Sequence, residues 1–208
     1  EMCIRDRAIL SRAPYKSLAG TNVDRDYVEM CSQMNEHWAF EPEVLKGYAR
    51  HYKTGEVIPD SLISKIQKAS TFNQGFTTTE LTGAALLDMK YGQTPEVEDV
   101  MAFEKKVSDE IGMPEEITFR YRSPYFKHIF GDDGYASGYY TYLWAQVLEA
   151  DAWELFKQTG IFDKKTAASF KKNILESGDT EDAMVLFKRF RGHNPDPKAL
   201  LRLRGFEK

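Results

Sequence analysis

Histidine and tyrosine side chains are concentrated in one segment of the second half of the chain. Residues 128–142 read HIFGDDGYASGYYTY. If a helix begins near Tyr135, then Tyr135, Tyr139 and Tyr142 occupy positions i, i+4 and i+7 and present their phenols on one face. A phenol hydroxyl is an uncharged hydrogen-bond donor, so three of them on one face suit the binding of a peptide carbonyl or of a developing oxyanion.

The alternative role for these tyrosines is an aromatic stripe in a hydrophobic core. Against it, each buried phenol needs a hydrogen-bond partner. In addition, the glycines Gly131, Gly134 and Gly138 favour a mobile backbone, and the segment from about 112 to 134 is predicted to be a flexible loop that leads into the tyrosines. The residues alone leave both interpretations open.

A second concentration of polar side chains lies nearer the amino end. Residues 26–37 read DYVEMCSQMNEH, and on a helix Glu29, Gln33 and Glu36 share one face at i, i+4 and i+7. A polar stripe that faced a core or a cleft would cost free energy unless it bound something. The alternative is a solvated helix face, which is the more common role of such a pattern.

Several other catalytic motifs are absent from the 208 residues. The sequence has no glycine-rich phosphate loop, no Gly-x-Ser-x-Gly elbow and no His-Glu-x-x-His (HExxH) motif, in which two histidines bind zinc. His51 and His193 are predicted to be surface residues rather than ligands. Cys3 and Cys31 are too few for a disulfide framework and form no Cys-x-x-Cys metal site.

The composition is that of an ordinary globular chain. Hydrophobic residues make up 42% and charged residues 29%, and the formal net charge is -4. No apolar run approaches the roughly 18 residues of a membrane span, and there is no basic footprint for nucleic acid. We therefore expect neither membrane nor nucleic acid as a partner. The low cysteine content favours a cytoplasmic location, although a secreted or periplasmic form stays open because the natural amino terminus is expected to be missing.

Apolar spacing, capping residues and glycines predict an all-α fold with at most short strands. The only strand candidates are 15–18 and 116–119. The expected helices are 60–74, a helix that starts at a capping box from Thr77 to Glu80 and continues through 81–89, one from Thr94–Pro95 to about 112, a long one through Trp144 and Leu155 to near Gly160, one from Asp163 to about 177, and one from Asp179 or Thr180 to about Arg191.

Several segments, in this order, resemble the carboxy-terminal part of the M3 family of zinc metallopeptidases. The segments are SLAGTNVDRDYVE at 17–29, SQMNEHWA at 32–39, YRS at 121–123, HIFG at 128–131 and GYYTYLW at 138–144. The sequence NEHWA at 35–39, together with AALLDM at 84–89, is most similar to the peptidyl-dipeptidase branch of that family.

The resemblance implies a multi-helix, zincin-like catalytic domain that hydrolyses peptide bonds in short oligopeptides with one zinc ion. In that family two histidines of an HExxH helix and one downstream glutamate bind zinc, which activates water and polarises the scissile carbonyl. Glu29 matches the downstream glutamate. His128, Tyr135, Tyr139 and Tyr142 match the segment that contacts the substrate and stabilises the oxyanion, with Tyr142 as the most direct donor.

The chain also departs from the family pattern. The second zinc-binding histidine of the family would fall near Ile4, and the first would precede residue 1. Asp132 and Asp133 stand where the family is rich in glycine. We therefore expect residues 1–7 to be a non-native junction and residues 8–208 to be the carboxy-terminal part of an M3-type catalytic domain, inactive without the missing amino-terminal portion of the same enzyme.

Two alternatives to a truncated peptidase follow from the missing motif. The chain could be a non-catalytic helical module that binds peptides or a partner through the tyrosine face. It could also be a separately encoded half that assembles with a chain bearing HExxH. For the peptidase itself, the residues do not decide between the release of dipeptides from a carboxyl end and the cleavage of internal bonds.

Overall fold

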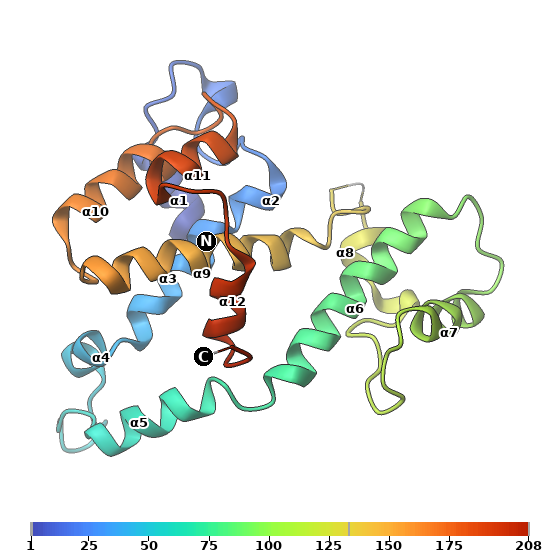
Figure 1. Ribbon diagram of the computed structural model, residues 1–208, viewed down its shortest axis with the longest axis horizontal. Coiled ribbons are helices and arrows are strands. Elements are labelled where there is room, and N and C mark those ends of the chain that lie inside the picture. The colour runs from blue at the N-terminus through green and yellow to red at the C-terminus, as the bar shows by residue number, and fades with distance from the viewer. Residues whose placement is uncertain (1, 133, 208) are drawn as a thin grey trace. The chain divides into compact units, whose positions relative to one another are not determined.

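The computed structural model describes residues 2–132 and 134–207. Within these ranges the chain is helical, with no β-strand and only an isolated bridge between Arg50 and Val57, so the predicted all-α class is confirmed (Figure 1). None of the helices described has the length and apolarity that crossing a bilayer requires. The α-helices are α1 (Met2–Leu10), α2 (Arg25–Val28), α3 (Met30–Phe40), α4 (Pro42–Tyr48), α5 (Asp60–Ala69), α6 (Gln74–Gln93), α7 (Val100–Glu110), α8 (Lys127–Phe130), α9 (Thr141–Thr159), α10 (Lys164–Phe170), α11 (Ala183–Arg191) and α12 (Pro197–Leu203).

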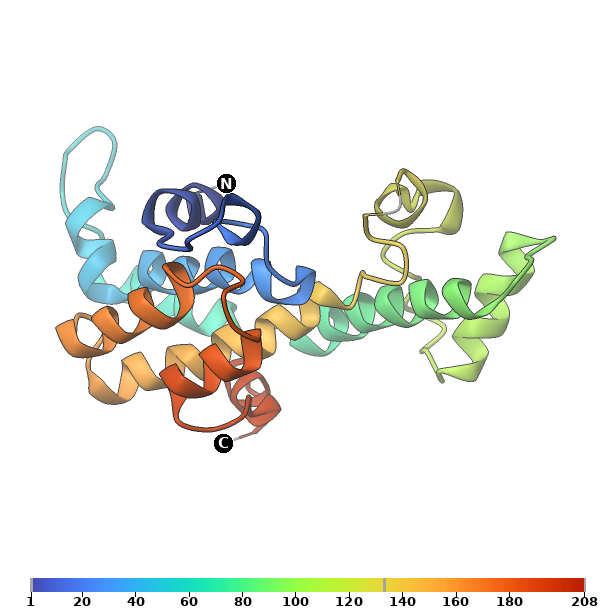
Figure 2. The same cartoon turned by 90° about the horizontal axis from the view of Figure 1, so that it is seen from above.

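The chain divides into two compact units. The first consists of Glu1–Phe72 and Ala145–Lys208, and the second consists of the intervening residues Asn73–Trp144. In Figure 2 the first unit contains the blue and orange helices, and the second contains the green and yellow-green ones. Each unit has its own buried side chains, so each is described by itself.

Helix α9 supplies the central buried face of the first unit. Leu148 and Ala152 are fully buried, as their spacing predicts, and Trp153 and Phe156 extend the buried face. The helix ends at Thr159, and the next residue, Gly160, has a φ of +110°, a conformation that favours glycine. The predicted long helix that ends near Gly160 is therefore confirmed.

Aromatic rings from three helices complete this core. The ring of Phe170 on α10 lies edge-on to Phe156 at a centroid distance of 5.8 Å and to Phe190 on α11 at 5.3 Å. Phe187, which lies about one turn before Phe190 on α11, is also fully buried. Because burying a side chain of this size contributes roughly 1.5–3 kcal/mol, these rings are a principal reason why α9, α10 and α11 pack together.

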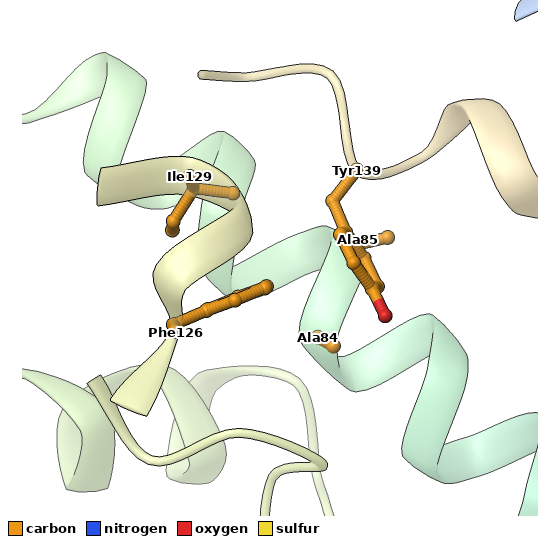
Figure 3. Close-up of a cluster of buried hydrophobic side chains, with 5 residues drawn as sticks. All are labelled: Ala84, Ala85, Phe126, Ile129 and Tyr139. Carbon is orange, nitrogen blue, oxygen red and sulfur yellow. The ribbon is translucent and has the colours of Figure 1, made fainter. Parts of the chain in front are cut away.

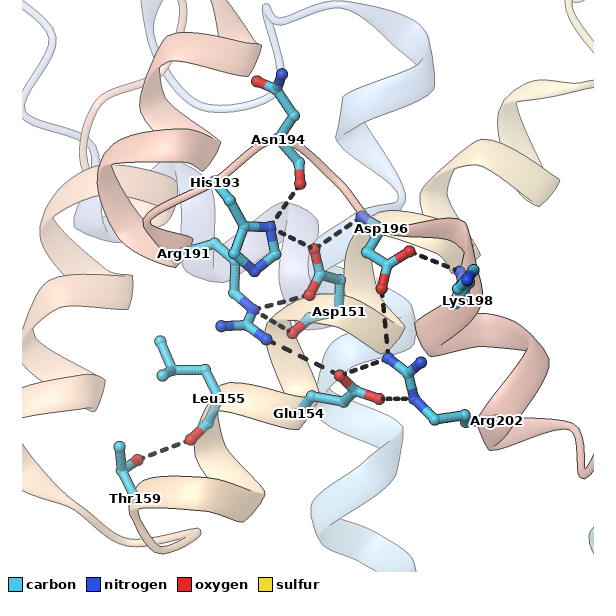
Figure 4. Close-up of polar contacts among 10 residues, drawn as sticks. All are labelled: Asp151, Glu154, Leu155, Thr159, Arg191, His193, Asn194, Asp196, Lys198 and Arg202. Carbon is cyan, nitrogen blue, oxygen red and sulfur yellow. Dashed lines mark hydrogen bonds and ion pairs between the residues drawn. The ribbon is translucent and has the colours of Figure 1, made fainter. Parts of the chain in front are cut away.

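Charged side chains, some of them fully buried, also join α9 to α11 and α12 in the first unit (Figure 4). Asp151 on α9 is fully buried, and its carboxylate accepts hydrogen bonds from Arg191 Nε at 2.8 Å and from the backbone N–H of Asp196 at 3.0 Å. One turn away, Arg202 Nε of α12 donates to Glu154 Oε1 at 2.7 Å. These contacts link α9 to the end of α11 and to α12.

The second unit is built on α6. Its small residues Ala84 and Ala85 are buried against Phe126, Ile129 and Tyr139, which come from later segments of the chain (Figure 3). Small side chains on α6 leave room for the large rings to approach the helix backbone. The segment that carries Tyr135, Tyr139 and Tyr142, called the tyrosine segment below, is thus packed on the same helix as α8.

A second cluster in this unit positions the segment that precedes α8. Leu87, Val107 and Phe119 are buried together. Nearby, the carboxylate of Glu104 on α7 accepts hydrogen bonds from the backbone N–H of Ser123 and from the guanidinium of Arg122. Burial raises the pKa of Glu104, but these hydrogen bonds outweigh burial and the net pKa is lowered, so the carboxylate is ionised and anchors the chain before α8.

Aspartate side chains cap the amino ends of several helices. Asp163 accepts a hydrogen bond from the backbone N–H of Thr166 at 2.7 Å, which confirms the predicted cap of α10. The helical region continues after α10 as a π-helical turn, Lys171–Leu175, close to the predicted end. Asp99 and Asp182 cap α7 and α11 in the same way.

Other predicted boundaries were wrong. Helix α6 begins before the proposed capping box, and Thr77 lies inside its first turn, where its hydroxyl donates to the carbonyl of Asn73. Helix α7 begins at Val100 rather than at Thr94–Pro95, and α11 begins at Ala183 rather than near Asp179, because the aspartates that accept backbone N–H groups come later in the chain.

Two further boundaries also differ from the expectation. Helix α5 ends at Ala69 rather than near 74. Of the strand candidates, residues 16–18 form a short 3-10 helix and residues 116–119 are irregular. The predicted loop from 112 to 134 contains a 3-10 helix, Ser123–Tyr125, followed by α8.

We predict that Asp151→Ala lowers the free energy of unfolding by about 3 kcal/mol, because it removes the short ion pair of the largely buried Arg191 and leaves only the longer ion pair, 3.9 Å, with Glu154. Urea denaturation followed by circular dichroism measures the loss. Glu181→Ala is the control, since its ion pair with Arg189 lies at the exposed surface and its removal should change stability much less. Equal losses in the two variants would contradict the role of Asp151.

Candidate functional site

The tyrosine segment is not the helix that its spacing suggested. Helix α9 begins only at Thr141, so Tyr135 and Tyr139 precede it in a series of turns. Ser137 has a φ of +55°, which lies outside the helical region. The prediction of a helix from Tyr135 was therefore wrong, because the turn is stabilised by contacts with α6 that the local spacing does not contain.

The structure nevertheless brings the predicted side chains together. The rings of Tyr135 and Tyr142 stack with a centroid distance of 5.7 Å, and Tyr139 lies 5.3 Å from Tyr142. His128 on α8 contacts all three, with ring-centroid distances of 6.1 Å to Tyr135, 5.6 Å to Tyr139 and 6.4 Å to Tyr142. We refer to His128, Tyr135, Tyr139 and Tyr142 as the His/Tyr cluster.

The members of the His/Tyr cluster differ in exposure. Tyr139 is 4% exposed and belongs to the hydrophobic core of the second unit, as the core interpretation proposed for the tyrosines. Tyr135 and Tyr142 are half-buried, and His128 is exposed. The cluster therefore has a buried base and an accessible rim, which is an arrangement that can hold phenols rigidly while leaving some of them open to a ligand.

Electrostatics keep the buried phenol neutral. Burial, helped by the nearby Tyr121, raises the pKa of Tyr139 to about 12, while the positive charge of Arg120 acts in the opposite direction. Tyr139 is thus a proton donor rather than a phenolate over the whole neutral range. This is the protonation state that stabilisation of an oxyanion requires.

Two residues that support the cluster were not predicted as site residues. Tyr121 stacks on Phe126 at 5.1 Å and contacts His128 at 5.4 Å. Asp88 is fully buried on α6 and accepts hydrogen bonds from the backbone N–H groups of Ser137 and Tyr139. The signal for Asp88 was available, since a charged residue interrupts the apolar run 84–89, but its partner could not be read from the sequence.

Glu29, the predicted metal ligand, lies at the junction of α2 and α3. It is half-buried, and its Oε2 accepts a hydrogen bond from the hydroxyl of Ser32 at 3.0 Å. Hydrogen bonding of this kind orients a carboxylate that binds a metal. Of the other members of the proposed polar face, Gln33 is half-buried and Glu36 is exposed.

The described residues do not by themselves form a metal site. Among them no group of three or more His, Cys, Asp or Glu side chains is placed to hold an ion. A zinc site with an open position for substrate needs three protein ligands, so Glu29 can supply one ligand at most. The residues present therefore fit one part of a zinc site and not the whole.

The remaining histidines are placed away from such a role. His37 pairs with the buried carboxylate of Glu149 and stacks on Trp153 at 4.8 Å, so it belongs to the core of the first unit. His51 and His193 are exposed, as predicted for surface residues. Cys31 is buried and free, and its sulfur accepts a hydrogen bond from Arg7 Nε at 3.1 Å.

We predict that Tyr139→Phe removes an ionisation step near pH 12 from the tyrosinate absorbance of the folded protein. Between about pH 10 and this value, Tyr139 is deprotonated in the unfolded chain and protonated in the folded chain. The contribution of Tyr139 to the free energy of unfolding is therefore fully present below about pH 10 and is lost as the pH rises through this range. Tyr125→Phe, at a 78% exposed position, controls for the loss of one chromophore. If the titration curves of wild type and Tyr139→Phe were superimposable above about pH 11, this assignment would be contradicted.

Comparison with known proteins identifies the family. Dipeptidyl carboxypeptidase of Escherichia coli strain K12 is 43% identical over 202 residues, which are 95% of this chain and 29% of that protein. Oligopeptidase A of Haemophilus influenzae strain Rd is 37% identical, with the same coverage of 95% and 29%. Mitochondrial intermediate peptidase of Arabidopsis thaliana is 30% identical over 89% of this chain and 26% of its own length.

The chain therefore spans less than a third of the length of each of these relatives. A family model described as peptidase family M3 matches residues 7–206, so the match begins at Arg7 within α1 and extends beyond α12. The whole second unit, nearly all of the first unit and the whole His/Tyr cluster lie inside the matched range. The extent of this match shows that the chain belongs to peptidase family M3.

Proposed function

We propose that this chain is the carboxy-terminal part of the catalytic domain of a zinc-dependent peptidase that hydrolyses short peptides. The observation that carries the proposal is the convergence of His128, Tyr135, Tyr139 and Tyr142 in the second unit, in a chain of family M3. The name of the relative from Escherichia coli, dipeptidyl carboxypeptidase, supports the release of dipeptides as the mode of cleavage. A cytoplasmic location remains part of this proposal.

The His/Tyr cluster would act on the substrate carbonyl. Tyr142 lies at the accessible rim and donates to the oxyanion as the tetrahedral intermediate forms. Tyr139 contacts the Tyr142 ring from the buried base, and Tyr135 stacks on the Tyr142 ring, which limits the rotation of that ring. His128, exposed beside them, contacts the bound peptide.

Glu29 would supply one zinc ligand, with the HExxH ligands outside these 208 residues. A zinc ion bound in this way lowers the pKa of water and polarises the scissile carbonyl. The hydrogen bond from Ser32 restricts the Glu29 carboxylate to one orientation. The chain's contribution to the metal is therefore one oriented carboxylate and not a site of its own.

The alternative function is a non-catalytic helical module that binds peptides or a partner through the same tyrosines. It gains support from the exposed aromatic side chains near the cluster, Tyr125 and Phe130, and from the absence of HExxH in the sequence. A separately encoded half that assembles with an HExxH-bearing chain is a third possibility. A complementing HExxH segment separates the binding module from the other two alternatives, because only a part of a peptidase gains activity from it.

We predict that the 208-residue chain alone binds zinc weakly and hydrolyses no peptide, because it offers one of the three ligands required. Isothermal titration with zinc and incubation with a blocked oligopeptide measure the two properties. Tight stoichiometric binding, or cleavage that a chelator abolishes, would show that the chain has a complete site and would overturn this proposal.

We predict that the chain restores zinc-dependent peptidase activity when it replaces the matching segment of the Escherichia coli dipeptidyl carboxypeptidase. In this chimera Tyr142→Phe should lower kcat about 100-fold with zinc retained, since it removes one oxyanion donor. Glu29→Gln should lower zinc affinity at least about 10-fold, since even the loss of a group that only orients a ligand has an effect of this size.

One control variant and one further measurement accompany the chimera. Glu36→Gln changes an exposed carboxylate of α3 and should leave zinc content and kcat unchanged. Metal analysis of each purified variant separates the two roles. Equal loss of zinc in Glu29→Gln and Tyr142→Phe would contradict the assignment, and an inactive but folded chimera would favour the binding module.

A further inference from the structure

A buried carboxylate lies directly beneath the turn that carries Tyr139. Asp88 on α6 is 1% exposed. Its Oδ1 accepts a hydrogen bond from the backbone N–H of Ser137 at 2.9 Å, and its Oδ2 accepts one from the backbone N–H of Tyr139 at 2.8 Å. Both carboxylate oxygens are therefore used, and both bind the same short turn.

The burial of Asp88 has a cost that these contacts offset. Burial, the larger effect, raises the pKa of Asp88, while the backbone N–H groups of Tyr139, Ser137 and Gly138 act in the opposite direction. A buried carboxylate without such donors would be strongly unfavourable. A hydrophobic residue at position 88 would add to the core with no such cost, so the carboxylate is best explained by what it holds.

The turn needs an external restraint. Ser137 adopts a left-handed φ of +55°, which is unfavourable for a residue with a side chain, and Gly138 N–H closes the turn on the carbonyl of Tyr135 at 2.8 Å. The turn also lies very close to α6, because a Cβ added at Gly92 would come within 1.9 Å of the Ser137 hydroxyl oxygen. The restraint and the space for the turn thus both come from one face of α6.

We propose that Asp88 is a positioning residue for catalysis, whose carboxylate holds the Ser137–Tyr139 turn on α6 and so sets the direction of the Tyr139 and Tyr142 phenols. Its importance for turnover rests on the proposed function, in which these phenols face the reacting carbonyl. Its control of the turn does not, because the two hydrogen bonds lie within the second unit and need no metal or substrate.

The first test uses the wild-type chain and needs no variant. In an acid titration followed by NMR, the amide signals of Ser137 and Tyr139 should shift together with one midpoint above the ordinary value of 3.8 for aspartate. The ring signals of Tyr139 and Tyr142 should shift with the same midpoint, since neutralising Asp88 weakens both hydrogen bonds. Amides that do not titrate together, or rings that stay unchanged while the amides titrate, would overturn the proposal.

The second test is Asp88→Asn, which keeps the shape of the side chain and removes its charge. The amide titration should disappear, and the ring signals of Tyr139 and Tyr142 should move from their wild-type positions. Asp99→Asn is a matched control in the same unit, because Asp99 also accepts two backbone N–H groups, those of Met101 and Ala102, but does so at the start of α7. Rings that move equally in both variants would show a general loss of structure and overturn a specific role.

The chimera with the Escherichia coli relative adds a kinetic measurement. There Asp88→Asn should lower kcat about 100-fold with KM and zinc content unchanged, because displacing a catalytic group by roughly 1 Å has an effect of this size. Asp88→Glu, which restores the charge, should recover part of the loss. Wild-type kcat in Asp88→Asn would overturn the catalytic role, whereas an inactive wild-type chimera would count against the proposed function, and the NMR titration would still decide the positioning role.

Discussion

Two hydrogen bonds from backbone N–H groups to the buried carboxylate of Asp88 determine where the His/Tyr cluster lies in the second unit. The turn between Tyr135 and Tyr139 has little regular structure of its own and includes a left-handed serine. Small residues on α6, Ala84 and Ala85, then allow the rings to pack closely against the helix. Helix α6 therefore supplies both the polar anchor and the apolar floor of the cluster.

The first unit uses the same principle on a larger scale. Asp151 and Glu149 are buried on α9, and each binds groups from elements distant in sequence, Arg191 and His37 respectively. A buried charge is tolerated only where its partners lie in one arrangement, so such pairs favour a unique packing of the helices around an aromatic core. Helix α3, which begins directly after Glu29, is joined to α9 by such a pair and by the stacking of His37 on Trp153.

The proposed chemistry is divided between the units. The metal ligand candidate lies in the first unit and the oxyanion candidates lie in the second. An uncharged phenol with a raised pKa suits the stabilisation of a developing negative charge, whereas a carboxylate oriented by Ser32 suits a cation. Neither group completes a reaction alone, which agrees with a chain that spans less than a third of its relatives' length.

Those features of the fold and of the family that depend on residue type and order could be predicted from the sequence. The helical class followed from apolar spacing, the cap of α10 followed from Asp163, and the family followed from several short motifs in a fixed order. The starts of α6, α7 and α11 were misplaced, because several polar residues near each start could serve as caps and only the folded backbone selects one.

By itself, then, the sequence determined the helical class, the family and which side chains are candidates for chemistry. Only the tertiary structure decided how those side chains meet. Tyr135, Tyr139 and Tyr142 come together through a turn and not through helical spacing, because the turn is bound by Asp88, which lies 49 positions from Ser137 and 51 from Tyr139 in the chain. Hydrogen bonds over such separations are set by the packing of α6 against the later segments, and no local pattern of residues records them.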